Sequence, residues 1–321
     1  MSNRNMNTAK VAKNDEFYTQ LKDIENEMRH YKPHFKDKVI YMNCDHPDRS
    51  NFWLFFKLQF NHLKPKRVIS TFYNEDGESF KTVYDGVEEV RTPLKGDGDF
   101  RSDECVAILK ESDVIATNPP FSLFREFIAL IMEFSKGFLV LGNNNAITYK
   151  ETFPLIKDNK MWLGMTNNTT MEFEVPDDYP LVSKGGRVDS DGTKFLKVPA
   201  ITWFTNLDYP KRHEDMLLWA SYKGSEDEYP EYDNIKAINI DRVAYIPYDY
   251  EGVMGVPISF IGRWNPSQFE ILGIDDDVEH GDLTYLKPEG WVGSSSRPIV
   301  NDKGVYRRIL IRNKKPKKEL F

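Results

Sequence analysis

The chain has 321 residues, a length that corresponds to about two domains. Hydrophobic residues make up 40% of the chain and charged residues 29%, which allows a packed core and argues against wholesale disorder. The two cysteines are too few for a disulfide framework, and the polar residues 1–14 lack the apolar core of a secretion signal. No apolar run approaches the roughly 18 residues of a membrane span. We therefore expect a soluble, cytoplasmic protein.

Charge is unevenly distributed along the chain. The formal net charge is −7, which does not indicate a basic nucleic-acid binder as a whole. Residues 225–300 carry a net charge of −10, whereas residues 301–321 contain eight basic and two acidic residues, a net charge of +6. A basic tail on an acidic body is consistent with a limited surface that contacts phosphate groups. A solvated tail that only aids solubility explains these charges equally well.

Apolar runs and helical patterns alternate along the first two thirds of the chain. Short apolar runs predict buried strands, and apolar residues spaced three or four apart predict helices. This alternation indicates an α/β fold with a mostly parallel twisted sheet and helices on both faces, in which residues 201–206 form the last strand. The expected strands are residues 39–43, 67–72, 113–117, 137–142 and 201–206, and the expected helices are residues 21–30, 51–63, 105–110 and 123–134.

The pattern changes after Pro210. The chain becomes acidic and rich in Tyr, Pro and Gly, with short strand-like runs at residues 243–246 and 256–261. We therefore expect two domains, residues 1–210 and residues 211–321, of which the second is a mixed module that ends in the basic tail.

The most informative motif is Asn118-Pro119-Pro120-Phe121, directly after the expected strand at residues 113–117. Open α/β sheets bind ligands at the carboxyl ends of their parallel strands. The two prolines stiffen the backbone and remove two amide donors, which leaves the Asn118 side-chain oxygen and the Pro119 carbonyl as acceptors beside the flat Phe121 ring. Such a site suits a planar molecule with an exocyclic amino group. An ordinary Asn-Pro-Pro turn is the alternative interpretation.

A wall of acceptors of this kind suits methyl transfer to an adenine amino group. The N6 lone pair of adenine is delocalised into the ring, so the amine is a poor nucleophile. Two accepted hydrogen bonds would localise that lone pair, and a sulfonium methyl group held in line then needs no strong base. An adenine from a duplex would have to leave the helix, and stacking on Phe121 would offset part of the unstacking cost.

A second loop follows the expected strand at residues 39–43. The side chains of Asn43 and Asp45, with Cys44 between them, and the amino terminus of the helix that begins at Asn51 could hold the amino-acid end of S-adenosylmethionine. A capped strand-to-helix turn fits the same residues.

Two further segments have the chemistry to contact this cofactor. Asp99 follows a glycine-rich turn and could accept a hydrogen bond from the cofactor adenine while Phe100 packs on its ring. A turn aspartate beside a core phenylalanine is the alternative. The segment Phe17-Tyr18-Thr19 could close over the cofactor, although its chemistry alone is a weak signal. No set of His, Cys and carboxylate residues has metal-ligand spacing, so we predict no metal.

Several segments together resemble a known family. They are residues 14–20 (NDEFYTQ), 23–27 (DIENE), 43–45 (NCD), 50–52 (SNF), 96–102 (GDGDFRS), 117–126 (TNPPFSLFRE), 141–143 (LGN), 146–150 (AITYK) and 203–207 (WFTNL). With these segments the sequence resembles the adenine-specific DNA methyltransferases of the EcoRI modification-enzyme type.

The resemblance implies a Rossmann-like methyltransferase fold, S-adenosylmethionine as methyl donor and N6-methyladenine in duplex DNA as product. Residues 1–210 would be the catalytic domain and residues 211–321 a target-recognition module. A restriction endonuclease would act on the same site without forming a stable complex, and we expect a monomer of bacterial or bacteriophage origin. By motif position, the cofactor side would include Tyr18, Thr19, Asn43, Asp45, Asp99 and Phe100, and the target-base side Asn118, Pro119, Pro120 and Phe121.

The loop at residues 41–50 departs from the usual pattern. It contains no glycine, whereas most methyltransferases of this fold have a glycine-rich first loop. The acid that usually holds the cofactor ribose after the second strand has three candidates here, Asn74, Glu75 and Asp76.

Two other functions compete with DNA adenine methylation. The same acceptors fit RNA adenine or the planar amide of a protein glutamine. A non-catalytic DNA-binding relative would keep the fold without the reaction. The basic tail, the large C-terminal module and the family resemblance argue against the first alternative, and the complete tetrapeptide at residues 118–121 argues against the second.

Overall fold

The computed structural model describes residues 18–75, 78–167, 169–177, 179–181, 185–293, 295 and 297–317. The chain forms two compact units. The first comprises residues 1–153 and 161–209, and the second comprises residues 154–160 and 210–321. The second unit is therefore discontinuous in sequence, a feature that the predicted division into residues 1–210 and 211–321 does not include.

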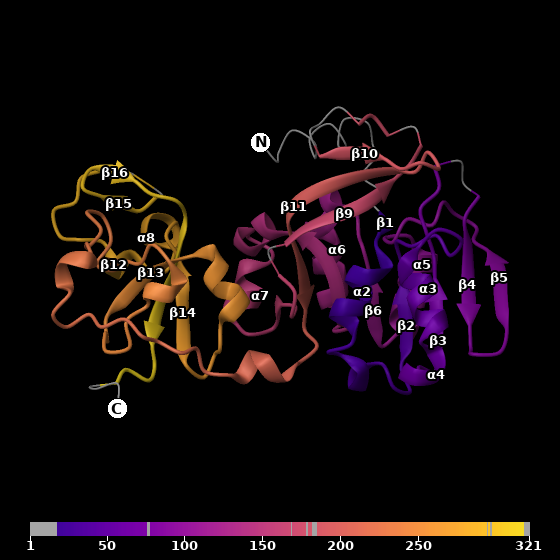
Figure 1. The fold of residues 1–321 in the computed structure, drawn as a ribbon, viewed down its shortest axis with the longest axis horizontal. Helices are drawn as coiled ribbons and strands as arrows, with labels where there is room; N and C mark the ends of the chain where they lie inside the picture. Colours follow the sequence, from indigo (N-terminus) through magenta and orange to yellow (C-terminus); the bar gives the residue numbers. More distant parts are fainter. Residues whose placement is uncertain are drawn as a thin grey trace. The chain divides into compact units, whose positions relative to one another are not determined.

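A mixed sheet, eleven-stranded over the described residues, is the framework of the first unit (Figure 1). Its main path has the order β1-β9-β11-β7-β6-β2-β3-β4-β5, and β8 and β10 pair with β11. The strands are β1 (Tyr18–Thr19), β2 (Val39–Met42), β3 (Arg67–Ser70), β4 (Phe80–Tyr84), β5 (Glu89–Pro93), β6 (Val114–Thr117), β7 (Gly137–Asn143), β8 (Trp162–Leu163), β9 (Thr169–Val175), β10 (Gly186–Val188) and β11 (Lys194–Thr205).

The four central strands of this sheet, β3, β2, β6 and β7, are parallel to one another. In the register of these strands, Ile40 on β2 lies opposite Val68 on β3 and Val114 on β6. The outer strands are antiparallel, because β11 runs against β7 and the β4–β5 hairpin extends the sheet beyond β3. The α/β class is confirmed, with a parallel centre inside a mixed sheet. In chain order β11 is the last strand of this sheet.

The helices predicted for this unit are all present. The predicted helix over residues 51–63 is divided at Gln59, where the backbone has φ −93° and ψ 6°. The helices are α2 (Leu21–Met28), α3 (Asn51–Leu58), α4 (Phe60–Leu63), α5 (Asp103–Glu111) and α6 (Phe124–Glu133).

Helices cover both faces of the parallel strands. Successive strand residues point to opposite faces. Ile40 and Met42 of β2 belong to a buried apolar cluster with residues of α2, α3 and α4. Tyr41 points to the other face, where its hydroxyl lies 2.7 Å from Thr71 Oγ1 and the Cys105 thiol of α5 lies 3.8 Å from the same atom. Burial on both faces explains why these strands are continuous apolar runs.

Six outer strands, β1, β4, β5, β8, β9 and β10, were not predicted. β5 is mostly exposed and therefore lacks an apolar run. β9 does carry a usable signal, because Met171, Phe173 and Val175 alternate with polar residues and are buried. Alternation with a period of two would have identified this strand.

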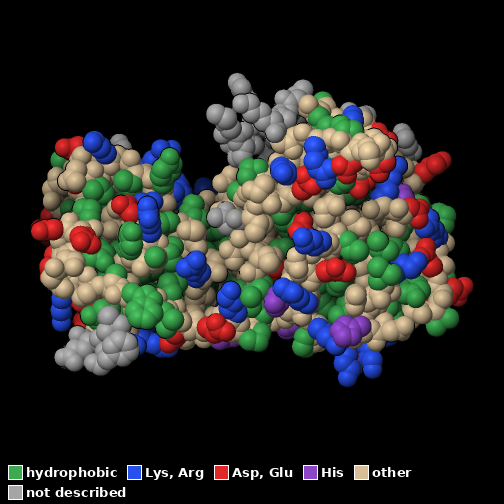
Figure 2. All heavy atoms as spheres, in the orientation of Figure 1, with side chains coloured by type: hydrophobic (Ala, Val, Ile, Leu, Met, Phe, Trp, Pro, Cys, Tyr) green, Lys and Arg blue, Asp and Glu red, His purple; other side chains and the backbone are tan. Residues whose placement is uncertain are grey.

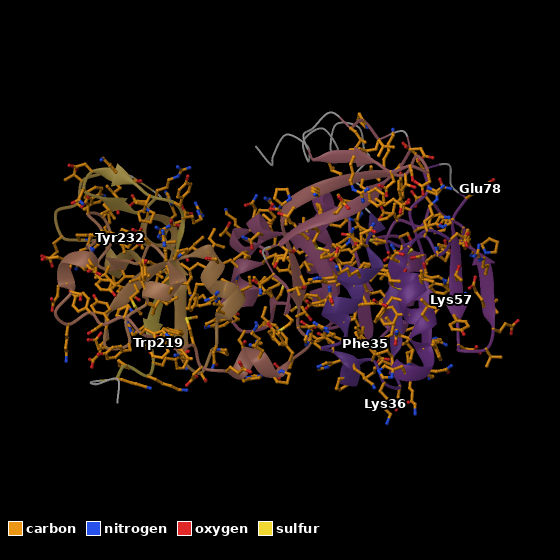
Figure 3. The ribbon with its side chains drawn as sticks, in the orientation of Figure 1. Phe35, Lys36, Lys57, Glu78, Trp219 and Tyr232 are labelled. Carbon is orange, nitrogen blue, oxygen red and sulfur yellow. The ribbon has the colours of Figure 1, made fainter. Side chains whose placement is uncertain are left out.

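The second unit contains a four-stranded sheet of order β12-β13-β17-β14. Tyr232 (Figure 3) lies in its core, and the tyrosine hydroxyl donates to Asn239 Oδ1 at 2.8 Å. The elements are α7 (Phe153–Lys157), whose first residue belongs to the first unit, β12 (Ile238–Asn239), β13 (Val253–Pro257), β14 (Phe269–Ile274), α8 (Asp277–His280), the separate hairpin β15 (Ile299–Val300) and β16 (Lys303–Gly304), and β17 (Arg308–Asn313).

Much of the predicted basic tail is not a tail. β17 lies between β13 and β14, with Ile309, Leu310 and Ile311 fully buried and Arg308 only 6% exposed. Further along, the Lys314 N–H donates to Gln268 O at 2.8 Å. The charge count concealed this strand because the apolar run between the basic residues is only three residues long.

Two strand predictions in the second unit are also wrong. Residues Val243–Tyr245 form a 3₁₀ helix. The predicted run at residues 256–261 is divided at Pro257, where β13 ends and a 3₁₀ helix, Ile258–Arg263, begins. Proline lacks the amide donor that a continuing strand needs. Among the described residues, no helix is both long and apolar enough to cross a membrane.

Candidate active site

Two loops with polar residues meet at one edge of the parallel sheet. Asn43, Cys44 and Asp45 follow β2, and Asn118 follows β6, its direct neighbour. Because both strands run in the same direction, their carboxyl ends lie at the same edge. The structure therefore brings together the predicted cofactor loop and the predicted target-base motif.

Asp45 joins these two loops directly. Its carboxylate accepts hydrogen bonds from the Ser50 hydroxyl at 2.5 Å and from the Thr117 hydroxyl, and Thr117 immediately precedes Asn118. Its backbone is held as well, since the Asp45 N–H donates to Thr71 O at 3.0 Å and the Ser70 hydroxyl donates to Asp45 O. The ends of β3 and β6 are thus both hydrogen-bonded to one residue after β2, the former through the Asp45 backbone and the latter through its side chain.

The Asp45 carboxyl group is only 6% exposed. Burial disfavours its ionised form and raises its pKa to about 6, although the hydrogen bonds from Ser50 and Thr117 act in the opposite direction. Sequence analysis placed Asp45 beside the cofactor but did not identify Ser50, Ser70 and Thr117 as its partners. The sequence does contain a signal for these partners. A hydroxyl residue ends each of the neighbouring strands β3 and β6, and another directly precedes α3.

The amino terminus of α3 connects the predicted cofactor loop to β1. The Ser50 hydroxyl caps this helix by accepting from the amides of Phe52 at 3.0 Å and Trp53 at 3.4 Å. Asn51 Nδ2 donates to Thr19 O at 2.8 Å. Thr19 is therefore held beside the cofactor loop. Tyr18 precedes it in β1, opposite Glu174 in the register of β9, and Phe17 lies outside the described residues.

Two buried polar atoms beside this loop have no hydrogen-bond partner among the described residues. They are the Thr19 hydroxyl oxygen and Gln20 Nε2. A buried polar group without a partner is costly, by roughly 1–3 kcal/mol. These atoms therefore fit a polar ligand at this position, such as the amino-acid part of S-adenosylmethionine.

The turn carrying Asp99 lies near the same edge, because the Cys105 thiol lies 3.6 Å from Gly98 O and 3.8 Å from the hydroxyl of Thr71, the residue that also bonds the Asp45 backbone. Burial is the main cause that raises the pKa of the Cys44 thiol, and the charges of Asp45, Cys105 and Asp99 raise it further. Asn43, the preceding residue, is only 2% exposed. The predicted cofactor residues of three separate segments are thus neighbours in the structure.

Asp99 is held by a single arginine. The Arg101 guanidinium donates to the Asp99 carboxylate at 2.6 Å and keeps the pKa of that group below its usual range. Arg101 also pairs with Glu126 of α6 at 2.5 Å. Phe100 is buried, with its ring centroid 5.2 Å from that of Phe127 in an edge-on arrangement. Phe100 thus occupies a core position, as in the alternative interpretation of the sequence. A contact between Phe100 and the cofactor stays a prediction.

The target-base motif forms a bend between β6 and α6. Asn118 and Phe121 are partly buried and Pro119 is buried. The Pro120 carbonyl accepts from the Leu123 amide at 3.0 Å, which starts a short 3₁₀ turn. The Phe121 ring lies edge-on to Phe173 of β9, with centroids 6.3 Å apart. The ring is therefore anchored by the sheet on one side.

Two of the three candidates for binding the cofactor ribose, Asn74 and Glu75, lie in the loop after β3. The Asn74 backbone N–H donates to Asp97 O at 2.8 Å, so this loop is tied to the turn that precedes Asp99. Glu75 follows it, and Asp76 lies outside the described residues. The structure thus places this loop near the other predicted cofactor segments.

Comparison with known proteins identifies the family of the chain. The family model for "Adenine-specific methyltransferase EcoRI" matches residues 5–314, which is nearly the whole sequence. The chain belongs to this family. No solved structure matches the chain.

Curated members of the family match over almost their full lengths. The Type II methyltransferase M.EcoRI of Escherichia coli is 42% identical over 338 aligned positions, which cover 99% of this chain and 98% of the relative. The Type II methyltransferase M.MpnI of Mycoplasma pneumoniae is 40% identical, with 96% of this chain and 98% of the relative covered. M.MgeORF184P of Mycoplasma genitalium, also named a Type II methyltransferase, is 39% identical, with 95% and 98% covered.

Family membership confirms that the protein is an adenine-specific methyltransferase. The assignment of the tetrapeptide at residues 118–121 to the target base stays a prediction. The motif directly follows Thr117, whose hydroxyl donates to Asp45 of the predicted cofactor loop.

Proposed function

We propose that the protein transfers the methyl group of S-adenosylmethionine to N6 of an everted adenine in duplex DNA, and that this modification protects the DNA from a restriction endonuclease. The parallel centre of the first unit would be the Rossmann-like core of the enzyme. The observation that carries the proposal is the hydrogen-bonded connection from Asp45 to Thr117, because it couples the loop for a methyl donor to the motif for an amine acceptor.

The residues present fit the cofactor. The Thr19 hydroxyl and the Gln20 amide nitrogen are buried polar atoms without a partner among the described residues, and the Thr19 carbonyl accepts from Asn51 at the start of the helix that follows the Asp45 loop. Asp99 is kept ionised by Arg101 and is therefore suited to accept from an adenine amino group. The bound cofactor supplies an electrophilic methyl group on a sulfonium.

The residues of the motif would hold the target base. Asn118 Oδ1 and the Pro119 carbonyl would accept the two N–H bonds of N6, which increases the electron density available on nitrogen. Phe121, anchored against Phe173, would stack on the base once it has left the duplex. The N6–methyl bond would form as the S–methyl bond of the sulfonium breaks, which leaves a neutral thioether. The methylated amine would then release one proton to water, and no side chain of the motif is required as a strong base.

The second unit would contact the DNA. It belongs to the matched family region, and the methyl-transfer residues described above all lie in the first unit. We further propose that the enzyme acts as a monomer without a metal, in the cytoplasm of a bacterium or encoded by a bacteriophage, and forms no stable complex with a partner nuclease.

One experiment tests this proposal against its alternatives. Purified protein is incubated with labelled S-adenosylmethionine in three separate reactions. The substrates are duplex DNA from a host without adenine methylation, RNA, and mixed protein. We expect label in DNA only, and sequencing of the product for modified adenine should give one short recognised site. Label in RNA or protein but not in DNA would reject the proposed substrate, and absence of any transfer would indicate the non-catalytic relative.

A further inference from the structure

A short two-stranded ribbon is presented by the second unit (Figure 1). β15 and β16 pair antiparallel, and a hydrogen bond from the Val305 N–H to Pro298 O at 2.8 Å extends the pairing by one residue. Asn301 and Asp302 form the turn, with φ angles of 50° and 62°. Two successive residues with positive φ are typical of the two-residue turn whose twist matches a β-ribbon.

The base and the turn of the ribbon are each fixed by a neighbouring residue, Asn234 and Asp233 respectively. Asn234 is 5% exposed, and its side chain donates to Arg297 O and accepts from the Ile299 N–H, both at 2.9 Å. The Asp233 carboxylate accepts from the Asp302 N–H at 2.8 Å. The ribbon is therefore ordered before it meets any partner, which reduces the entropy lost on binding.

The ribbon exposes aromatic and basic side chains, which are the types that commonly contact nucleic acids. Tyr306 is 89% exposed, and continuing the register by one residue beyond Val305 and Pro298 places it across from Arg297. Arg297 and Lys303 are exposed, and neither side chain has an ion-pair partner within the described part of the chain. The large exposed ring of Tyr306 across from Arg297, with Lys303 on the other face of the ribbon, indicates an interaction surface.

The charge of the ribbon differs from that of its surroundings. Residues 297–308 contain four basic residues and one acidic residue, whereas residues 225–300 carry a net charge of −10. Two of these basic residues serve the fold, because Arg308 is buried and Arg307 lies 3.6 Å from the Asp275 carboxylate. The other two remain for a partner. Figure 2 shows basic side chains at the end of this unit where the ribbon lies.

We propose that the β15–β16 ribbon enters a groove of the DNA duplex and positions the recognised site. The DNA major groove has the width of a two-stranded ribbon. Arg297 and Lys303 are placed to contact phosphates or base edges, and Tyr306 is placed to pack against bases or sugars. This inference rests on the proposed function, since it names the surface that would hold the DNA substrate.

The test uses the full-length protein and a duplex that contains the site found by sequencing. Three single variants, Arg297→Ala, Lys303→Ala and Tyr306→Ala, are compared with Tyr285→Ala, a control tyrosine of the same unit that is 59% exposed. Each ribbon variant should bind the duplex about tenfold more weakly and methylate it with a correspondingly higher KM for DNA. Loss of a phosphate contact should reduce the slope of log K against log salt by about 0.9.

Binding of S-adenosylmethionine and the thermal unfolding midpoint serve as internal controls and should not change. If all three ribbon variants bind DNA with the same affinity and salt slope as the parent protein, the proposal is overturned, even when the parent methylates DNA. Equal losses in Tyr285→Ala would also overturn it, because the effect would then not belong to the ribbon. The proposed function fails separately, if the parent protein transfers no methyl group to DNA adenine.

Discussion

At the scale of single residues, the proposed reaction would depend most directly on Asn118. We expect Asn118→Ala to lower kcat by at least about 100-fold, because one of the two acceptors of the N6 hydrogens is lost. DNA binding should survive, since in the proposed mechanism Asn118 would contact only one base. Filter binding and methyl transfer measured on the same preparation check this expectation. Asn145→Ala, an exposed asparagine in the turn after β7, is the matched control and should keep full activity.

Asp45 makes a separate prediction about pH. Its pKa is raised to about 6 in the folded protein, so between pH ~4 and ~6 the folded state holds a proton that the unfolded state has lost. This carboxyl group therefore lowers the stability of the protein as pH rises through that window. In Asp45→Asn this contribution is absent, and the stability difference between variant and parent should shift in favour of the variant by about 1–3 kcal/mol from pH 4 to pH 7.

Urea unfolding at both pH values measures this difference. Asp48→Asn is the control of opposite sign, because Arg91 holds the pKa of Asp48 below its usual range. Its contribution to stability is present above the ordinary pKa and is lost as pH falls. A pH-independent difference between Asp45→Asn and the parent would show that the Asp45 carboxyl group is not perturbed by burial.

At the scale of elements, two helix-capping serines can be compared to distinguish an effect on stability from an effect on cofactor binding. Ser50 caps α3 and also donates to Asp45, whereas Ser102 caps α5 by accepting from the Cys105 amide at 3.3 Å. Replacement of either serine by alanine should cost about 1 kcal/mol of unfolding free energy. Only Ser50→Ala should also weaken cofactor binding, several-fold by calorimetry. Equal cofactor affinity in the two variants would contradict the role given to the Asp45 network.

The elements also differ in how well their sequences predicted them. The buried strand Val114–Thr117 is a continuous apolar run, so its position was evident from sequence. The 3₁₀ helix Val243–Tyr245 contains the same kinds of residues but none of them is buried. Short apolar runs carry no information about their surroundings, and burial decides which of them become strands.

At the scale of the whole molecule, the second unit includes a segment from within the first. Residues 154–160 belong to it, and the Arg212 side chain, 8% exposed, donates to Asn159 Oδ1 in that segment. We therefore expect a fragment of residues 211–321 to be less stable than the same unit in the full chain. Hydrogen exchange on β17 and β13 would measure the difference, and equal protection in fragment and full chain would contradict it.

The sequence by itself determined the α/β class, the family and the residues of the two predicted binding segments, because buried strands and short chemical motifs are local patterns. Only the tertiary structure decided that Asp45 holds Thr117, that Phe100 packs on Phe127, and that the residues from Arg308 form a central strand instead of a tail. Those facts depend on which distant segments become neighbours. That outcome is set by packing and by the need to pair buried polar groups, and neither is recorded in local sequence.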